Sequence, residues 1–308
     1  MSSQPLISVV LPLHNGAQFV EWALRSLAAQ TLTAELVVVD DGSTDDGVAL
    51  VRRLAPEALV ISTGGKGVAC ARNAGAFAAR GDLVAFVDQD DFWHPDRLRS
   101  AVGALGDADA VVTGETGFGL LGDREAFASN AALVPQRLFA SLDEAWSWST
   151  QRTLPSVTPR LLAVQEIIEA PIATTTSFLF RREFFFRCGG FPVHARSVDD
   201  YLLTLNAARL GRLLLARDDA VMYRIRPDST FQTGDRWLPY LTSLLAVTRG
   251  GQVPPSGQAS QLPGTAEHLL LELAATGRLR DAAALARLLG GVQPSRLLRA
   301  RLRALRSR

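Results

Sequence analysis

The first third of the chain alternates continuous apolar runs with segments of helical periodicity, and this alternation constrains the fold more than any other feature. The apolar runs are short and rich in β-branched residues, so they predict strands that are buried on both faces. Such strands, separated by helices, are typical of an α/β fold with a parallel sheet covered on both sides. The predicted strands are residues 7–11, 35–41, 58–62, 82–88 and 109–113, and the predicted helices are residues 17–30, 43–55, 67–81 and 95–106.

Capping residues mark the ends of these predicted helices. Ser43 and Thr44 open the second helix and are candidates for its N-cap. Gly81 follows the Ala-rich third helix, and we expect it to end that helix in the left-handed conformation that glycine adopts easily. Pro95 opens the fourth helix and Gly106 closes it.

The pattern changes after residue 113, where no clean period continues. A Pro-, Gly-, Gln- and Ser-rich stretch at residues 250–264 is typical of a linker, and amphipathic helices are predicted beyond it. In between, we expect a strand at 174–180, a helix at 199–211 and strands at 212–216 and 220–225. The chain is therefore expected to comprise a domain at 1–235, a linker at 236–264 and a C-terminal helical, Arg-rich extension at 265–308.

Composition excludes several classes of protein. The chain is 47% hydrophobic, which argues against disorder, and its net charge of +1 argues against nucleic acid as a partner. Cys70 and Cys188 are expected to be reduced thiols. The chain start lacks a basic signal region, so we expect a cytoplasmic protein. The extension, with six arginines between Arg296 and Arg308, predicts peripheral contact with the inner face of a membrane. A packed or partner-binding helix is the alternative.

Polar residues follow three of the predicted strands. These are His14 and Asn15 in "PLHNG", Asp40 and Asp41 in "DDGS", and residues 88–91 in "DQDD". Ligands bind beyond the carboxyl ends of parallel strands, so three such ends predict one shared site. For "NG" alone, ordinary turn chemistry explains the residues equally well.

The sharpest pattern is Asp88–Gln89–Asp90. In an extended segment the two carboxylates face the same side, and carboxylate pairs bind hard divalent cations that hold phosphate oxygens. The sequence therefore predicts a metal site that binds a diphosphate. The alternative is that Asp91 or Asp96 caps the helix that follows Pro95.

These motifs, taken together and in this order, resemble glycosyltransferase family 2, a family of inverting enzymes with the GT-A nucleotide-sugar fold. The resemblance runs from about residue 6 to about residue 231. It implies a nucleotide-sugar-binding half at 1–113 and an acceptor and catalytic half at 114–235. It rests on "ISVVLPLHNGAQFVEWALRSLAAQT", "LVVVDDGSTDDG", "GVACARNAGAFAARGDLVAFVDQDDFWHPDRL", "SFLFRREFFFRCGGF" and "MYRIRPDST".

The resemblance implies a role for each matching residue. Asp41 is expected to contact the base, with Asp40 as the weaker candidate, and Asp88 and Asp90 are expected to hold Mn²⁺ or Mg²⁺. Arg72 is expected to meet ribose or phosphate, a surface salt bridge being its alternative. The nucleotide-sugar-binding residues implied are Pro12, His14, Asn15, Asp40, Asp41, Gly67, Arg72, Asp88 and Arg226.

Two positions depart from the family pattern. The general base of the family lies in an acidic pair after "GGF", so Asp200 is implied as the base, with Asp199 in place of the usual glutamate. Arg226 stands where many relatives have a histidine. An arginine is no metal ligand and binds phosphate through two bonds, so we expect Arg226 to bind the donor diphosphate directly. Arg224 is the competing candidate.

The sequence thus predicts a metal-dependent inverting glycosyltransferase that uses a nucleotide-diphosphate sugar, with UDP as the expected nucleotide. The acceptor is expected to be a hydroxyl of a lipid-linked glycan, a polysaccharide end, a peptide or a small metabolite. Trp146 and Trp148 offer an aromatic platform for an acceptor sugar, or they pack in the domain. The alternatives in other classes are a sugar-1-phosphate nucleotidyltransferase and a catalytically silent nucleotide-sugar-binding protein.

Overall fold

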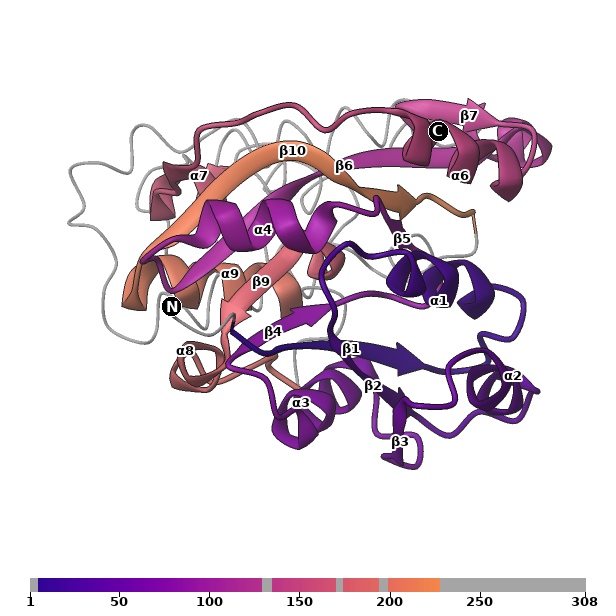
Figure 1. The fold of residues 1–308 in the computed structure, drawn as a ribbon, viewed down its shortest axis with the longest axis horizontal. Helices are drawn as coiled ribbons and strands as arrows, with labels where there is room; N and C mark the ends of the chain where they lie inside the picture. The colour runs from indigo at the N-terminus through magenta and orange to yellow at the C-terminus, as the bar shows by residue number, and fades with distance from the viewer. Residues whose placement is uncertain (1–4, 129–134, 170–173, 194–198, 228–308) are drawn as a thin grey trace, which may run out of the picture. The chain divides into compact units, whose positions relative to one another are not determined.

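The computed structural model of the chain describes residues 5–128, 135–169, 174–193 and 199–227 (Figure 1). The chain forms two compact units, one of Met1–Val164, Ala173–His194 and Asp199–Thr233, the other of Gln165–Ile172, Ala195–Val198 and Gly234–Arg308. The predicted linker and the helical extension lie outside the described residues. The domain division made from the sequence therefore stays a prediction. The first unit holds all of the described residues except 165–169.

Strands and helices alternate through the first half of this unit. The strands are β1 (Ile7–Leu13), β2 (Glu35–Asp40), β3 (Leu59–Ser62), β4 (Leu83–Phe86), β5 (Phe92–Trp93), β6 (Ala110–Leu120), β7 (Arg137–Phe139), β8 (Arg160–Leu161), β9 (Phe178–Arg181) and β10 (Leu213–Arg224). The helices are α1 (Val20–Ala28), α2 (Gly47–Leu54), α3 (Val68–Ala78), α4 (Arg97–Leu105), α5 (Arg124–Ala128), α6 (Leu142–Gln151), α7 (Val164–Glu169), α8 (Arg182–Arg187) and α9 (Asp199–Leu210).

The described strands form one mixed sheet in the order β3-β2-β1-β4-β9-β6-β10-β5, with β7 beside β6 and β8 beside β10. β1 is parallel to β2 and β4, β2 to β3, and β6 to β7 and β10. β9 enters antiparallel between β4 and β6, and β5 and β8 pair antiparallel with β10. The α/β fold with a mostly parallel sheet is therefore confirmed.

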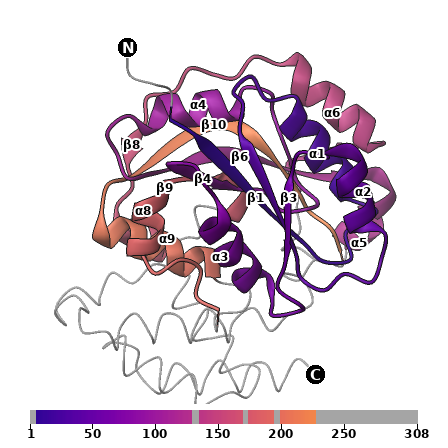
Figure 2. The same cartoon turned by 60° about the horizontal axis from the view of Figure 1, so that its bottom comes forward.

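Helices cover both faces of the sheet, as Figures 1 and 2 show. On β1, Val9 and Leu11 pack in one apolar cluster with side chains of α1, α2 and α4. Val10 points to the opposite face, where α3 comes so close that a Cβ on Gly75 would lie 2.3 Å from Val10 Cγ1. Because both faces of β1 are apolar and covered, the polar residues that follow its carboxyl end are the ones left to meet a ligand.

β6 is longer than the sequence predicted. The prediction ended at residue 113, whereas the strand continues to Leu120 and pairs with β10 and then β7. Gly114, Gly117 and Gly119 hide this extension, because glycine weakens the strand signal of a sequence without preventing backbone pairing.

The two strands predicted at 212–216 and 220–225 are one strand, β10, with a bulge in its middle. Asp218 is fully buried at this bulge. Its Oδ1 accepts hydrogen bonds from the backbone N–H groups of Gly114 and Ala220, at 3.0 and 3.2 Å. These bonds satisfy backbone donors that the interrupted ladder leaves without partners.

Two of the predicted helix ends are wrong. α2 begins after Asp46, and Ser43 and Thr44 lie in the preceding turn rather than at its N-cap. Gly81 does not end α3 in a left-handed conformation, because α3 has already ended three residues earlier. A Cβ on Gly81 would lie 2.7 Å from the backbone nitrogen of Ser8, so the close approach of the chain to β1 explains this glycine.

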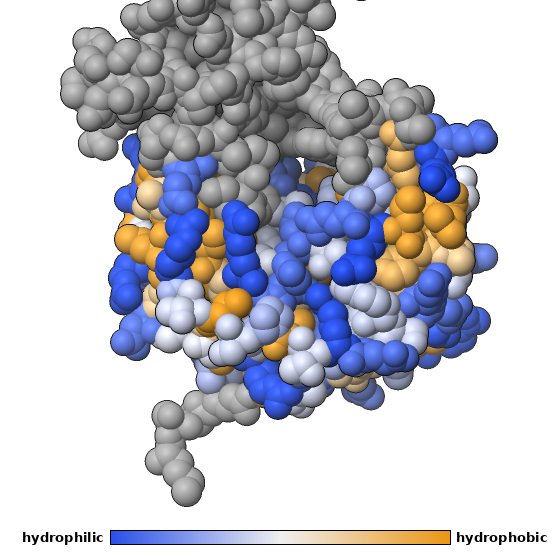
Figure 3. Space-filling model, turned by 90° about the horizontal axis from the view of Figure 1, so that it is seen from above, coloured by the Kyte–Doolittle hydropathy of each residue, from blue (hydrophilic) through white to orange (hydrophobic). Residues whose placement is uncertain are grey.

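No helix among the described residues is long and apolar enough to cross a membrane. On the face shown in Figure 3, apolar side chains gather in two areas and hydrophilic side chains occupy the band between them. The two apolar areas on the described part of this face are therefore separate from each other. The predicted membrane contact falls on the extension, which lies outside the described residues.

Candidate active site

The loops that follow β1, β2 and β4 meet at one edge of the sheet. The backbone N–H of His14 donates to Gln89 Oε1 at 2.9 Å, and Gln89 Nε2 donates to the His14 carbonyl oxygen at 3.1 Å. His14 Nδ1 lies 2.9 Å from the carbonyl oxygen of Asp41. A Cβ on Gly16 would lie 2.3 Å from Gln89 Oε1, so this contact needs a glycine there. The convergence predicted from the three strand ends is confirmed.

Asn15 joins the first loop to the second. Its φ of 47° is left-handed, which asparagine tolerates better than most residues. Its Oδ1 accepts hydrogen bonds from the backbone N–H and Oγ1 of Thr44, at 2.9 and 3.2 Å. Asp40 accepts from the backbone N–H of Ser43 at 2.9 Å, and Pro12 is buried in β1 just before the loop. These residues build the loops, and a ligand contact for them stays a prediction.

Asp41 organises the loop between β3 and α3. Its Oδ1 accepts from Thr63 Oγ1 and from the backbone N–H of Lys66, both at 2.7 Å. Its Oδ2 accepts from the backbone N–H of Gly67 at 2.8 Å, and Gly67 has a left-handed φ of 96° that lets the chain turn into α3. A carboxylate can accept about four hydrogen bonds, so Asp41 retains capacity for a base N–H.

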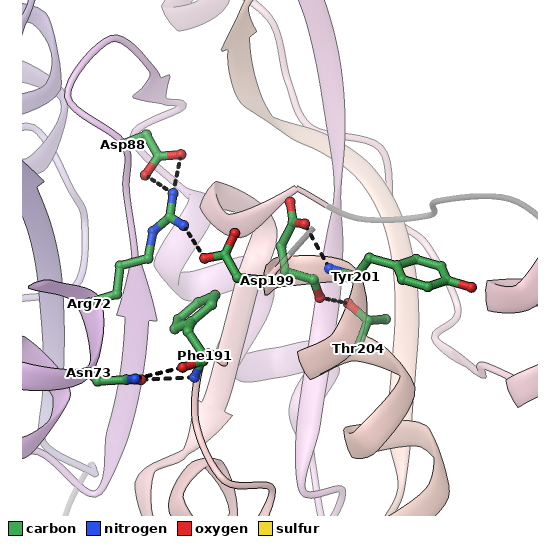
Figure 4. Close-up of polar contacts among 8 residues, drawn as sticks. Arg72, Asn73, Asp88, Phe191, Asp199, Tyr201 and Thr204 are labelled. Carbon is green, nitrogen blue, oxygen red and sulfur yellow. Dashed lines mark hydrogen bonds and ion pairs between the residues drawn. The ribbon is translucent and has the colours of Figure 1, made fainter. Parts of the chain in front are cut away.

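Arg72 is buried in α3 and contacts two carboxylates. Its Nη2 donates to both oxygens of Asp88, at 2.7 and 2.9 Å, and its Nη1 donates to Asp199 Oδ2 at 2.8 Å (Figure 4). Burial opposes the charge on Arg72, but Asp88 and Asp199 outweigh it and raise the pKa of the guanidinium. The predicted contact of Arg72 with ribose or phosphate stays untested. Its salt-bridge alternative holds in part: Arg72 does form salt bridges, but the pair with Asp199 is buried and the pair with Asp88 is partly buried, so neither lies on the helix surface.

Asp90 is paired with Arg226. Arg226 Nε donates to Asp90 Oδ2 at 2.9 Å, and the guanidinium carbon of Arg226 lies 4.2 Å from the centre of the Phe19 ring. Burial raises the pKa of Asp90 above its ordinary value, Arg226 opposes this, and Asp88 adds to it. The structure thus brings the predicted phosphate-binding arginine to the predicted metal-binding carboxylate.

Asp91 has a structural role. It is 1% exposed, and its Oδ1 accepts from the backbone N–H of Arg224 at 2.8 Å, which fixes the end of β10. Burial, with the nearby charges of Asp90 and Asp88, raises the pKa of Asp91 well above its ordinary value. Asp96 stands at the N-cap position of α4 but makes no side-chain capping bond. The predicted capping alternative is therefore wrong for both residues, since neither aspartate side chain caps α4.

Asp199 and Asp200 are the first two residues of α9, and the helix predicted at 199–211 begins at this acidic pair. Asp199 is 5% exposed and bound to Arg72, while Asp200 Oδ1 accepts from the backbone N–H of Tyr201 at 2.7 Å. Burial and the neighbouring charge of Asp199 raise the pKa of Asp200 to about 7, although Arg72 works in the opposite direction. A carboxyl with this pKa exchanges a proton readily near neutral pH.

The donor set at Asp88 and Asp90 fits a divalent cation that takes its other ligands from a diphosphate and water. Among the described residues, no three His, Cys, Asp or Glu side chains gather where a metal ion would be held by protein alone. A phosphate-bound cation needs only one or two carboxylates. Asp88 has both oxygens on Arg72, whereas Arg226 contacts Asp90 through Oδ2, which makes Asp90 the better placed ligand.

Trp146 and Trp148 pack in the domain. The Trp146 ring lies 5.7 Å from that of Phe92, in a cluster under α6. The guanidinium carbons of Arg137 and Arg152 lie 4.3 and 4.5 Å from the centre of the Trp148 ring. These contacts favour the packing alternative over a platform for an acceptor sugar.

The sequence reasoning missed three contributors. It treated Gln89 as a spacer in the metal motif and passed over Phe19, the partner of Arg226. It also missed Glu115 on β6, whose Oε2 accepts from Thr174 Oγ1 at 2.6 Å and whose pKa is raised by burial. A charged residue between Gly114 and Gly117 was the available signal, because the glycines already marked an unusual strand.

Comparisons with known proteins find similar sequences and similar folds. The uncharacterized glycosyltransferase alr2836 of Nostoc is 39% identical over 110 residues, a match that spans 34% of each chain and thus about a third of that relative's length. The crystal structure of Staphylococcus aureus TarS 1–349 with UDP-GlcNAc superposes with a TM-score of 0.64 at 16% identity, covering 98% of this chain and 91% of that one. Mannosyltransferase PcManGT of Pyrobaculum calidifontis, in complex with GDP-Man and Mn²⁺, gives a TM-score of 0.56 at 23% identity, covering 100% and 89%.

The two solved structures share the GT-A fold with this chain. The model of the family described as Glycosyl transferase family 2 matches residues 8–188, which hold the loops after β1, β2 and β4, Arg72, and both carboxylates of the Asp88–Asp90 motif. The chain belongs to glycosyl transferase family 2.

Proposed function

We propose that the protein is an inverting glycosyltransferase that moves a sugar from a nucleotide-diphosphate sugar to the hydroxyl of an acceptor. The observation that carries this proposal is Asp200, a partly buried carboxyl whose pKa is raised to about 7 and whose neighbour Asp199 is joined through Arg72 to Asp88. A proton acceptor is thereby linked to the carboxylates expected to face the donor diphosphate.

In the proposed reaction the acceptor hydroxyl attacks the anomeric carbon on the face opposite the leaving diphosphate. Asp200 takes the hydroxyl proton as the new bond forms, and the single displacement inverts the configuration. Asp199, next to Asp200 in the chain, is neutralised by its ion pair with Arg72. A base whose pKa lies near the working pH is about half deprotonated and still accepts a proton strongly, which suits this step.

Asp90 and Asp88 are the residues proposed to hold Mn²⁺ or Mg²⁺, which would offset the charge of the leaving diphosphate. The guanidinium of Arg226, which is bonded to Asp90, adds a positive charge beside the proposed metal site. The Mn²⁺ and the nucleotide sugars named for PcManGT and TarS support a metal and a nucleotide-sugar donor here. UDP is the proposed nucleotide, with Asp41 accepting the base N–H.

The acceptor proposed is a glycan end or a lipid-linked glycan, met on the cytoplasmic side of a membrane. Membership of the family leaves the nucleotidyltransferase alternative without support. Measuring turnover of the donor distinguishes an enzyme from a catalytically silent binding protein.

The test compares a panel of UDP- and GDP-sugars by thermal shift, each with Mn²⁺ and with EDTA. A donor that binds the folded state raises the melting temperature by mass action. Release of free nucleotide from that donor should then increase with pH as Asp200 loses its proton, with a midpoint near its pKa of about 7.

The matched variant is Asp200→Asn, which keeps the shape of the side chain and removes its basicity. It should retain the thermal shift and lose turnover by a factor of about 10²–10⁴. Binding without turnover in the native protein would support the silent binding protein instead, and a panel with no shift would sink the donor assignment.

A further inference from the structure

Two adjacent residues of α3, Asn73 and Arg72, form hydrogen bonds with the chain before α9, at Phe191, and with its first residue, Asp199. Asn73 Nδ2 donates to the carbonyl oxygen of Phe191 at 2.7 Å, and the Phe191 backbone N–H donates to Asn73 Oδ1 at 2.8 Å. Arg72 Nη1 donates to Asp199 Oδ2, in the first residue of α9, at 2.8 Å. Figure 4 shows both side chains of α3 pointing at this part of the chain.

The contact between Asn73 and Phe191 is a two-point clamp. A side-chain amide that bonds both the N–H and the carbonyl of one residue fixes that residue's peptide groups in position and orientation. Gly190 has a left-handed φ of 65°, and a Cβ there would lie 2.6 Å from Asn73 Oδ1, so the glycine makes room for the clamp. The Phe191 ring is buried edge-on against Phe86, with centroids 4.9 Å apart.

Arg72 fixes the other side through charge. Its side chain is 8% exposed, and its two terminal nitrogens are each bound to a carboxylate, of Asp88 and Asp199. Its Nε is buried and has no hydrogen-bond partner among the described residues, so the bonds of this guanidinium to the described residues come from its terminal nitrogens. The guanidinium fork serves two carboxylates at once, which a lysine ammonium on a flexible stem does less well.

We propose that Arg72 and Asn73 together are positioning residues for the base: they fasten Phe191 and Asp199 to α3 and so fix Asp200 relative to Asp88. The proposal rests on the proposed function, in which Asp200 is the base and Asp88 faces the donor. It gives Arg72 a role in aligning the two halves of the site in place of a direct contact with the donor.

The test uses Asn73→Ala, which removes the clamp and leaves every carboxylate and arginine of the site in place. Misplacing a catalytic group by about 1 Å costs on the order of a hundredfold, so kcat for donor hydrolysis should fall at least about tenfold. The KM for the donor and the affinity for UDP with Mn²⁺ should change by less than about twofold, because no group proposed to contact the donor is altered. Amide hydrogen exchange at Phe191 and at the start of α9 should become faster.

Asn206→Ala is the matched control. Asn206 lies on α9 and donates a single hydrogen bond to the Cys188 carbonyl oxygen at 3.3 Å, in the same loop. This variant removes an amide of the same size and should keep native kcat and native exchange at Phe191. Arg72→Lys should lower kcat without weakening UDP binding, and Asn73→Asp, which keeps the bond to the Phe191 N–H, should retain more kcat than Asn73→Ala.

The outcomes separate this inference from the function on which it rests. If the native protein neither binds nor hydrolyses any donor, the proposed function fails, while faster exchange at Phe191 in Asn73→Ala alone would still support the clamp. If the native protein is active and Asn73→Ala and Asn206→Ala share the same kcat, the positioning role is overturned. A large loss of UDP affinity in Arg72→Lys with unchanged kcat would return Arg72 to the donor.

Discussion

Two aspartates follow β4, each is paired with an arginine, and the two pairs differ in kind. Asp88 receives two bonds from Arg72, which is 8% exposed and also holds Asp199. Asp90 receives one bond from Arg226, which is 14% exposed and stacks on Phe19. The carboxylates themselves do not explain the contrast, since Asp88 is the more exposed of the two, at 25% against 17%.

The difference therefore lies in the arginines. Arg72 is built into α3 and joins the motif to the second half of the domain, so its position is set by the fold. Arg226 follows β10, the last described strand, and lies over the ring of Phe19 in the loop after β1. We infer that the pair of Asp88 and Arg72 belongs to the frame of the domain, while the pair of Asp90 and Arg226 is the one that exchanges its contact for a cation and a phosphate.

The largest expected effect is on stability. Arg72→Gln leaves Asp199 and Asp88 without their cation, and breaking such a buried pair costs about 3–5 kcal/mol of unfolding free energy. Arg226→Gln should cost less, about 1.5 kcal/mol of unfolding free energy, because its charged hydrogen bond to Asp90 lies at a shallower site. Urea unfolding in EDTA measures both.

Arg25→Gln is the control for this comparison, since its pair with Glu21 on α1 is exposed, at 52% and 40%. An exposed helical pair contributes about 0.3–0.5 kcal/mol. Equal losses for Arg72→Gln and Arg226→Gln would remove the distinction between frame and exchangeable pair.

The second effect is on metal-dependent donor binding. Asp90→Asn should remove most of the Mn²⁺-dependent part of UDP affinity, about 2 kcal/mol or more, because the better placed carboxylate is lost. Asp88→Asn should weaken UDP binding and also lower the melting temperature, because Arg72 then loses one of its two carboxylates. Titration calorimetry with UDP, with Mn²⁺ and with EDTA, separates the two. A stability loss confined to Asp90→Asn would reverse the roles assigned to the two aspartates.

The sequence predicted the alternating half of the fold because burial on both faces leaves a local mark in every strand. It did not predict β6 beyond residue 113 or the single bent strand β10. Those elements depend on pairing between segments about a hundred residues apart and on Asp218, which reads locally as a turn residue. Local patterns carry little information about such bonds.

The site was predicted in the same uneven way. The meeting of the loops at His14, Asp41 and Gln89 follows from the rule that parallel strands end at one edge. The partners of the arginines do not follow from this rule. Arg72 binds Asp199 at a separation of 127 residues in the sequence, and Arg226 binds Asp90 at a separation of 136. A charged residue in a motif shows that a charge is needed, whereas only the fold shows which partner receives it.

The smallest expected effect tests whether Arg226 leaves Asp90 for the donor. If it does, Arg226→Ala should weaken UDP binding by about 1.5 kcal/mol, the lower end for a charged hydrogen bond. Native protein in EDTA should keep some UDP affinity through Arg226, and this remainder should disappear in the variant. Mn²⁺ binding without UDP should move the other way and become tighter in Arg226→Ala, because Asp90 no longer has a competing cation beside it.

Phe19→Leu sharpens this last comparison. It removes the aromatic face under Arg226, whose contribution is about 0.5–1 kcal/mol at a partly exposed site, and keeps an apolar side chain. The UDP affinity should therefore fall by less than in Arg226→Ala, with the charge of Arg226 still present. Identical UDP and Mn²⁺ binding in native protein and Arg226→Ala, with and without metal, would mean that neither Arg226 nor Asp90 exchanges its partner for a ligand, and the two pairs would then both belong to the frame.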